Sequence, residues 1–473
     1  MISGELRRSA YMFEAIRQAN LFTYQEKIQQ LKAEATGRLF SVTNEIEKVD
    51  PLAFFSAYEA IEEDRWFWTS ADQQTFFVGI GSAIQFESEK ADLQFIQNEW
   101  NDILQHAEID NPYENIGTGP VIYGGEPFDY KKATTSLWKH FETSRFILPK
   151  YMLVVDKDQC FMTYNLFVKA TTASEQFTDD WEKLEMGLKE KPIYEEIVTK
   201  AIRAEEIEPE DWKDTIQLAT DTIARGEAHK IVLAREIRVT LSASAHIGAL
   251  LHELLQTQPN SYVFAFSHQG DSFIGASPER LVRVYDDEVL STCLAGTAPR
   301  GKHPIEDETL SRDLLNDPKN RSEHHFVVDM IRKAVQPFCD ELNIPEKPTV
   351  TQLKNLQHLY TPVEATLKPS AHLFNLVQAL HPTPALGGTP KEASLAFIRE
   401  HELLDRGWYG APIGWLDAQQ NGEFAVAIRS GLIQKDEASL FAGCGVVEDS
   451  DPEMEYAETK MKFRPMLSIL EDE

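Results

Sequence analysis

Residues 443–462, GCGVVEDSDPEMEYAETKMK, join an apolar, glycine-containing run to a strongly charged segment. We expect a tight turn at the glycines, followed by a helix that starts at Ser450 with Pro452 in its first turn. Ser450 and Glu453 have the spacing of a capping box, in which each side chain bonds the backbone N–H of the other residue. The stretch therefore predicts a turn that leads directly into a charged helix.

This expected helix carries two carboxylates and an ammonium group on one face. Glu458 follows Glu455 by three residues and Lys462 follows Glu458 by four, so the three side chains are neighbours on the helix surface. Carboxylates beside an ammonium group can hold a hard cation and an anion together, and oxygen ligands suit magnesium. A solvated helix with intrahelical ion pairs is the alternative, because charged helix faces are common.

The composition is that of a globular protein with a strongly acidic surface. Hydrophobic residues make up 42% of the 473 residues, and 76 acidic residues against 46 basic ones give a net charge of -30. Such a surface repels nucleic acid and anionic membranes, so we expect neither as a partner. An anionic substrate would need a metal ion or a local basic cluster to reverse the field in its pocket.

The cysteines and the apolar runs favour a cytoplasmic protein. Cys160, Cys293, Cys339 and Cys444 are far apart and form no CxxC pair, which is typical of a reduced chain. The first residues, MISGELRRSAYMFEAIRQ, have no apolar core of a signal peptide, and the sequence has no run of 18 apolar residues.

The apolar patterns predict an α+β fold with large antiparallel sheets, because strand-like runs follow one another as hairpins instead of alternating with helices. Asn421-Gly422, between two such runs, is a strong hairpin signal. A charged stretch at 203–213 separates residues 1–205 from residues 206–473. We expect strands at 38–42, 65–69, 75–84, 120–124, 144–155, 160–169, 230–241, 262–267, 272–276, 280–285, 288–294, 349–366, 409–417, 423–434 and 438–447. We expect helices at 4–35, 90–107, 176–201, 212–226, 306–316, 322–342, 371–380 and 391–400.

Four further stretches have the character of active-site segments. HKIVLAR places Lys230 at the start of a strand, GASPERL places Glu279 after a tight turn, and LHPTPALGGTPK is a proline- and glycine-rich loop that enters a helix. NRSEHHFVVDMI places Glu323 at a helix N-terminus, where the macrodipole favours a carboxylate. Taken singly, each stretch is a weak indication: Lys230 could be a surface lysine, Glu279 a turn carboxylate and Glu323 a helix cap.

Together and in this order, these stretches resemble the chorismate-utilising enzymes, which include anthranilate, aminodeoxychorismate, isochorismate and salicylate synthases. The resemblance covers about 210–471, and the first 200 residues match more loosely. It implies a sandwich of two large, mainly antiparallel sheets with helices packed outside, in which both parts of the chain form one interlocked domain. The motifs are SPE at 277–279, AGT at 295–297, EH at 323–324, VAIR at 426–429, GCGVV at 443–447 and ExxETxxxK at 455–462.

The resemblance implies a metal site and a substrate site. Glu323 and Glu458 match the carboxylates that hold Mg²⁺, and Glu455 matches one that reaches it through water, while the metal binds the ring carboxylate of chorismate. Thr297 matches a pocket-lining residue, and His358 matches a histidine near the reacting ring. A strand histidine bonded only by backbone is the alternative for His358. Four positions match residues that receive the substrate's carboxylates: Tyr409, Arg429, Gly443 and Lys462.

Two positions sort the chemistry within the family and point to isochorismate synthase, an isomerase. The ammonia-using synthases lack Lys230, whereas water addition needs an amine that can accept a proton. Salicylate and anthranilate synthases carry threonine at Ala385, and isochorismate synthases carry alanine. Water would add at ring carbon 2 of chorismate while hydroxide leaves carbon 4, with Lys230 as the base and Glu279 as the acid. We expect Glu279 to lie in the drier part of the site.

Three alternatives remain open from the sequence. A salicylate synthase would share Lys230 but would also eliminate pyruvate. An anthranilate or aminodeoxychorismate synthase subunit would need an amidotransferase partner. A homologue that only binds chorismate would lack activity. For the isochorismate synthase we expect a monomer without an obligate protein partner, serving menaquinone or catechol siderophore synthesis. The long N-terminal part, with RWFWTS and FFVGIG, resembles the menaquinone enzymes.

Overall fold

The computed structural model describes residues 23–32, 37–60, 63–173, 175–189, 199–352 and 356–471. Their strands form two large sheets in which β1 and β5 are parallel neighbours and the other paired strands are antiparallel. The larger sheet has 13 strands, in the order β10 (Ala201–Glu206), β11 (Lys230–Leu241), β23 (Glu437–Val446), β22 (Ser430–Gln434), β13 (Asp271–Ser277), β12 (Tyr262–His268), β2 (Arg65–Thr69), β3 (Thr75–Ile80), β8 (Tyr151–Asp156), β9 (Gln159–Val168), β1 (Arg38–Ile46) and β5 (Glu108–Asp110), with β19 (Gly388–Thr389) beside β11.

The smaller sheet has 10 strands, in the order β16 (Cys339–Asn343), β18 (Leu356–Leu367), β15 (Glu288–Pro299), β14 (Arg280–Tyr285), β21 (Gly422–Val426), β20 (Pro412–Asp417), β6 (Val121–Gly125), β7 (Ser144–Leu148) and β4 (Ile84–Ser88), with β17 (Thr349–Gln352) beside β18. The described helices are α2 (Pro51–Ser56), α3 (Leu93–Gln105), α4 (Gln176–Lys189), α5 (Pro209–Ala224), α6 (Ile247–Thr257), α7 (Pro304–Asn316), α8 (Pro318–Val335), α9 (Leu373–Leu380), α10 (Lys391–His401) and α11 (Pro452–Leu467), with a short 3₁₀ turn at Ser136–Trp138.

The two sheets pack face to face over an aromatic layer. Trp66 of the larger sheet stacks on Tyr123 of the smaller one with ring centroids 4.5 Å apart, and the rings of Phe77 and Trp415 meet in a tilted arrangement with centroids 4.6 Å apart. These four rings are almost fully buried, and aromatic pairs of this kind dominate core packing. Helices pack on the outer faces, so the expected α+β sandwich is confirmed.

Strands from the N-terminal part lie inside both sheets. β2 pairs with β12 in the larger sheet, and β6 pairs with β20 in the smaller one. Neighbours in each sheet therefore come from residues far apart in the chain. No helix in the described part of the chain is both long enough and apolar enough to cross a membrane.

Four expected strands are wrong in continuity, among them the run at 349–366, which forms two antiparallel partners, β17 and β18. The run at 75–84 breaks at Gly81, whose φ of 68° turns the chain from β3 of one sheet toward β4 of the other. The run at 144–155 divides in the same way into β7 and β8. The run at 423–434 breaks at Arg429, which has a φ of 51°. Period-two patterning shows which residues are extended but not where a strand leaves its sheet.

The helix predictions err mainly at their ends. The helix expected at 176–201 is described as α4 as far as Lys189, and β10 starts at Ala201 and runs into the stretch at 203–213 that was expected to be a charged joint. The helix expected at 322–342 corresponds to α8, which begins at Pro318 and ends at Val335, and strand β16 already begins at Cys339 inside the expected range. We predicted no helix at α6, and of the helix expected at 4–35 only residues 23–32 are described, as helix.

Candidate active site

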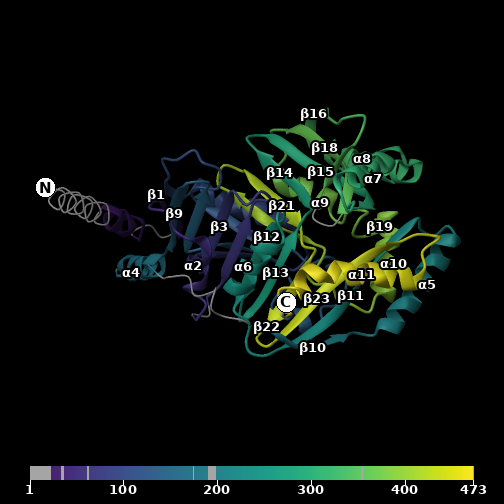
Figure 1. The fold of residues 1–473 in the computed structure, drawn as a ribbon. Helices are drawn as coiled ribbons and strands as arrows, with labels where there is room; N and C mark the ends of the chain where they lie inside the picture. The colour runs from purple at the N-terminus through teal and green to yellow at the C-terminus, as the bar shows by residue number, and fades with distance from the viewer. Residues whose placement is uncertain are drawn as a thin grey trace.

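The site forms where elements of the two sheets meet. β11, β23 and α11 belong to the larger sheet and its helices, whereas α8 packs on β15 and β18 of the smaller sheet. In Figure 1, α8 lies with β15 above and α11 with β11 and β23 below, with β19 between them. Lys230 and Glu323 join the two groups, because Lys230 Nζ lies 3.3 Å from Glu323 Oε1.

The start of α11 differs from the expected capping box. Asp451 is the N-cap, and its carboxylate accepts hydrogen bonds from the backbone N–H groups of Glu453 and Met454. Ser450 instead donates its hydroxyl to Glu455 Oε1 at 2.7 Å and accepts from the backbone N–H of Val447 at 3.1 Å. An aspartate satisfies the same donors as a serine, so the sequence left the two positions ambiguous.

The expected charged face of α11 is confirmed. Lys462 Nζ lies 2.6 Å from Glu458 Oε1 and donates to the backbone carbonyl of Gly443 at 2.8 Å. Gly443 lies within β23 and not in a turn, which corrects the expected turn at the glycines. Lys462 thereby ties α11 to β23 and leaves Glu458 half-exposed toward the site.

Glu279 lies among the basic groups of the site. It follows β13, where its N–H donates to Ser277 Oγ at 3.2 Å and its carbonyl accepts from the N–H of Val426 at 3.0 Å. Burial raises the pKa of its carboxyl to about 7, while the positive charges of Arg429, Lys230 and Lys462 oppose that rise. The raised pKa agrees with the expectation that Glu279 lies in the drier part of the site.

Arg429 sits at the break between β21 and β22, where its left-handed backbone turns its side chain away from the strand alternation. Burial lowers the pKa of its guanidinium, and Tyr409, Glu279 and Glu458 act in the opposite direction. Tyr409 is 6% exposed, and burial raises the pKa of its hydroxyl to about 12. Arg429 therefore lies where charges from β13, α11 and the segment before β20 converge.

Thr297 and His358 face each other across β15 and β18. Thr297 Oγ1 lies 3.0 Å from His358 Nδ1, and the two residues are direct cross-strand partners. Burial lowers the pKa of His358, a hydrogen bond with the Gly296 backbone opposes this, and the charges of Arg429 and Lys462 lower it further. The ring is thus held by its strand neighbours and still faces the basic groups of the site.

The sequence and the fold both match known proteins. The family model described as chorismate binding enzyme matches residues 26–471. This chain belongs to the chorismate-binding enzyme family. It is 39% identical over 439 residues to "Isochorismate synthase MenF" of Bacillus subtilis, covering 91% of this chain and 93% of that protein.

Two further relatives extend over nearly the whole chain. "Salicylate biosynthesis isochorismate synthase" of Pseudomonas aeruginosa is 33% identical over 452 residues, with 95% of this chain and 93% of that protein covered. The solved structure of MenF, described as the menaquinone-specific isochorismate synthase from Escherichia coli, matches with a TM-score of 0.79 at 25% identity, covering 95% of this chain and 100% of that one. These three relatives are all described as isochorismate synthases.

Sequence reasoning missed one member of the site, Gly445. A Cβ atom at this position would lie 2.5 Å from Cε of Lys230 and 3.2 Å from its Nζ. The Lys230 side chain therefore crosses β23 directly over Gly445, which only a residue without a side chain allows. The GCG motif contained a sequence signal for this role: Gly445 lies two residues after Gly443, and residues two apart in a strand share a face.

Two further residues named by the family resemblance, Ala385 and Glu323, lie near Lys230, and the structure corrects one argument about Glu323. Ala385 is half-buried in the turn that precedes β19, whose Thr389 pairs with Lys230, so this loop borders the base position. Glu323 lies in the second turn of α8, because the helix begins at Pro318 and is capped by Asp317. The argument that a helix N-terminus stabilises Glu323 is therefore wrong, since the dipole acts within the first turn.

The carboxylates of the site fit a hard cation in their chemistry but are not gathered in advance. In the part of the chain that is described, no three His, Cys, Asp or Glu side chains come together as a cluster able to hold a metal ion. Glu323 and Glu458 are each bound to a lysine, whereas Glu455 keeps a buried oxygen, Oε2, without a hydrogen-bond partner among the described residues. An unsatisfied buried acceptor is costly and suits a water or a cation.

Proposed function

We propose that this chain is an isochorismate synthase, an isomerase that converts chorismate into isochorismate. Water adds at ring carbon 2 while the hydroxyl at carbon 4 leaves as the double bond shifts. The observation that carries the proposal is the meeting of Lys230 with Glu323, within reach of the charge of Glu279. Two relatives at 39% and 33% identity that are named isochorismate synthases support it.

Lys230 and Glu279 have opposite roles in this proposal. Lys230 takes a proton from the entering water, and Glu279 gives a proton to the leaving hydroxyl. With a pKa of about 7, a large share of Glu279 carries its proton near neutral pH, as a general acid requires. The protein thus provides the acid through burial.

The substrate is a dianion, and two cationic side chains and one hydroxyl group can bind its carboxylates. Arg429 can bind a carboxylate through two parallel N–H donors, and Lys462 adds a point charge that is already anchored on Gly443. Tyr409 adds a hydroxyl beside Arg429. These groups provide a local positive field within a chain whose net charge is -30.

We further propose Mg²⁺ as the cofactor, held by Glu323 and Glu458 directly and by Glu455 through water. When bound, the ion neutralises these carboxylates and receives the ring carboxylate of chorismate. Glu323 and Glu458 are each paired with a lysine, Lys230 and Lys462, so a bound cation would compete with these two ion pairs for the carboxylates.

One assay separates this function from its rivals. The purified chain, incubated with chorismate and Mg²⁺ but without ammonia, should give a product of the same mass as chorismate and no pyruvate. Pyruvate release would identify a salicylate synthase instead, and an amino product that appears only with ammonia would identify an anthranilate or aminodeoxychorismate synthase. Lys230→Ala should abolish turnover yet still bind chorismate, since Arg429 and Lys462 remain.

The pathway and the assembly state follow as further proposals. The relative named MenF is 39% identical, against 33% for the salicylate biosynthesis enzyme, and the matching structure is described as menaquinone-specific, which supports menaquinone synthesis. Deletion of the gene should then remove menaquinone and leave catechol production intact. We also propose that the protein works in the cytoplasm as a monomer, which sedimentation of the purified chain tests.

A further inference from the structure

Strand β11, which begins with Lys230, lacks a strand partner along part of one edge. On one side it pairs with β23 from Ile231 to Thr240. On the other side it pairs with β19 only at Lys230 and Ile231 and with β10 only from Ile237 to Leu241. Within the described part of the chain, residues 232–236 thus form an open edge between two short pairings. Backbone bonds reach only its two ends, where the N–H of Val232 donates to the carbonyl of Gly387 at 3.5 Å and the N–H of Ile207 donates to the carbonyl of Glu236 at 3.2 Å.

Side chains satisfy the backbone groups of this open edge. Arg406 Nη2 donates to the carbonyl of Val232 at 2.8 Å. The N–H of Ala234 donates to Glu402 Oε2 at 2.7 Å, and the carbonyl of Ala234 accepts from Trp212 Nε1 at 3.0 Å. Buried backbone groups need such partners, and here a salt bridge and an indole replace the missing strand.

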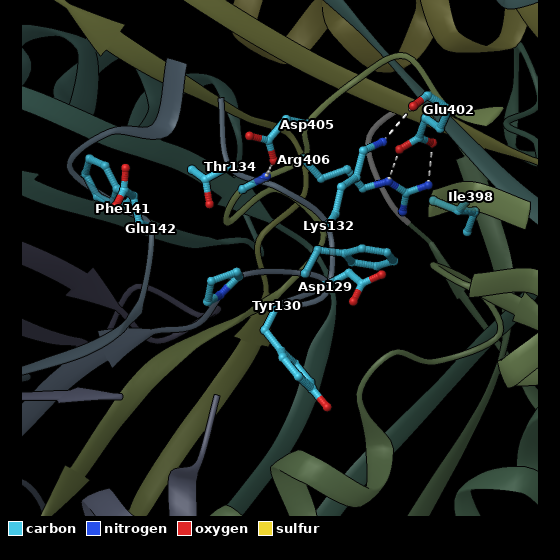
Figure 2. A pocket seen from close by; sticks show the side chains of 13 residues that line it. Asp129, Tyr130, Lys132, Thr134, Phe141, Glu142, Ile398, Glu402, Asp405 and Arg406 are labelled. Carbon is cyan, nitrogen blue, oxygen red and sulfur yellow. Dashed lines mark hydrogen bonds and ion pairs between the residues drawn. The ribbon is translucent and has the colours of Figure 1, made fainter. Parts of the chain in front are cut away.

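Arg406 and Glu402 form a fully buried, two-point ion pair. Arg406 Nε lies 2.7 Å from Glu402 Oε1, Arg406 Nη2 lies 2.6 Å from Glu402 Oε2, and the side chains are 3% and 1% exposed. Lys132 Nζ donates to the backbone carbonyl of Glu402 at 2.6 Å, and Figure 2 shows the three side chains together. The guanidinium also lies 4.2 Å from the ring centroid of Phe128. Such packing fixes the pair in one geometry.

The same guanidinium reaches the loop that holds Ala385. Arg406 Nη1 donates to the carbonyl of Leu386 at 2.9 Å, while Nη2 holds Val232. Leu386 is the neighbour of Ala385, and Val232 is two residues from Lys230. The planar guanidinium of Arg406 therefore joins β11, the strand of the proposed base Lys230, to the loop that carries Ala385.

A buried ion pair contributes little net stability, because desolvation offsets most of its attraction. Its rigid fork can instead fix the distance between the two backbone segments that it binds. We infer that the Arg406–Glu402 pair is a positioning element that sets Lys230 and the Ala385 loop in the relation needed for water addition. This inference rests on the proposed function, because it assigns the pair's effect to the base and to the loop beside it.

Arg406→Lys tests the inference, because it keeps the charge but cannot hold Val232, Leu386 and Glu402 together. We expect kcat to fall on the order of 10- to 100-fold, since small displacements of a catalytic group have effects of this size. The KM for chorismate should change less than about threefold, because the substrate-binding residues are untouched. The fall should also be non-additive with that of Ala385→Thr, since both changes act on one loop.

The matched control is Arg65→Lys on β2. Arg65 is also buried, donates to the carbonyl of Phe55 at 3.1 Å and faces Glu59 at 3.7 Å. This variant should lower the melting temperature but leave kcat unchanged. If Arg406→Lys behaved like Arg65→Lys, with a lower melting temperature and unaltered kcat, the pair would be structural only and the inference would be overturned.

Trp212→Phe keeps the test decisive if Arg406→Lys does not fold. It removes the indole donor to Ala234 at the same edge and keeps an aromatic ring beside the Arg235 guanidinium, so kcat should fall with KM unchanged, by less than in the arginine variant. An unaltered kcat in this variant would count against the inference. The product of the wild-type chain tests the proposed function separately, because the ratio of variant to wild-type kcat can be measured for whichever product forms.

Discussion

The proposed acid, Glu279, makes a prediction about the pH dependence of the rate. Its pKa is raised to about 7 by burial, and it must be protonated to give up a proton. The kcat/KM of the free enzyme should therefore fall as pH rises through about 7. Glu279→Gln should cost on the order of 10²–10⁴ in rate and remove this alkaline limb. An alkaline limb that persists in the glutamine variant would assign it to another group.

The same raised pKa predicts a pH-dependent stability. The pKa of about 7 in the folded state lies above the ordinary value of 4.5, so the unfolded chain releases this proton first. The stabilising contribution of the protonated carboxyl is thus complete below about pH 4.5 and is lost as pH rises through about 7. Glu279→Gln cannot ionise, so its melting temperature relative to wild type should rise across that window. A difference that stayed constant with pH would show that Glu279 titrates normally.

Gly445 supplies a prediction about the position of Lys230. Gly445→Ala would bring a methyl group to 2.5 Å from Cε of Lys230, so the flexible lysine must move. We expect a clear loss of kcat with little loss of stability, because the far end of a side chain yields more easily than backbone. Kinetics and thermal melting of the variant check both parts. Unchanged kcat would mean that the lysine works from a different position.

At the level of single residues, the sequence was informative where chemistry requires particular side chains in a fixed order. Lys230, Glu323, Glu458 and Lys462 were proposed in this way; Lys230 contacts Glu323, Lys462 contacts Glu458, and the charges of both lysines act on Glu279. Gly445 was missed because its role depends on the path of a side chain from a neighbouring strand. Such paths follow from strand register, which a single sequence does not state.

At the level of elements, α8 and α11 supply the proposed metal ligands from opposite sides of the site. Glu323→Ala and Glu458→Ala should each abolish turnover and weaken Mg²⁺-dependent chorismate binding, because one hard-oxygen ligand is lost. Glu455→Gln should be milder, since an amide oxygen can still accept a hydrogen bond from a bound water. Calorimetric titration with Mg²⁺ and chorismate measures the binding, and full activity in excess chelator would refute the metal proposal.

Element boundaries were predictable where a pattern changes and unpredictable where the chain changes sheet. β11 and β14 match their expected ranges, because their apolar alternation ends at turn residues. Pro149 and Lys150 interrupt the expected strand at 144–155, which becomes β7 and β8, but they do not indicate that the two halves belong to different sheets. Both halves are buried in the sandwich, so hydrophobicity alone does not mark the crossing.

On the scale of the whole molecule, the interleaved sheets bear on whether the two parts of the chain can fold apart. β2 lies between β12 and β3, and β6 lies between β20 and β7. Without residues 1–205, β12 and β20 would each expose an unpaired edge, and the aromatic layer would lose rings such as Trp66 and Tyr123. Exposed edges and apolar faces promote aggregation rather than folding. We therefore propose that the chain is one interlocked domain.

This proposal predicts that the intact chain unfolds in one cooperative transition and that residues 206–473 do not fold alone. Scanning calorimetry of the intact chain should show a single peak whose calorimetric and van't Hoff enthalpies agree, as a single cooperative unit requires. The fragment should lack near-ultraviolet circular dichroism, because its aromatic layer is incomplete. A folded, chorismate-binding fragment 206–473 would show that the catalytic part is autonomous, and that the N-terminal strands only complete sheets that can form without them.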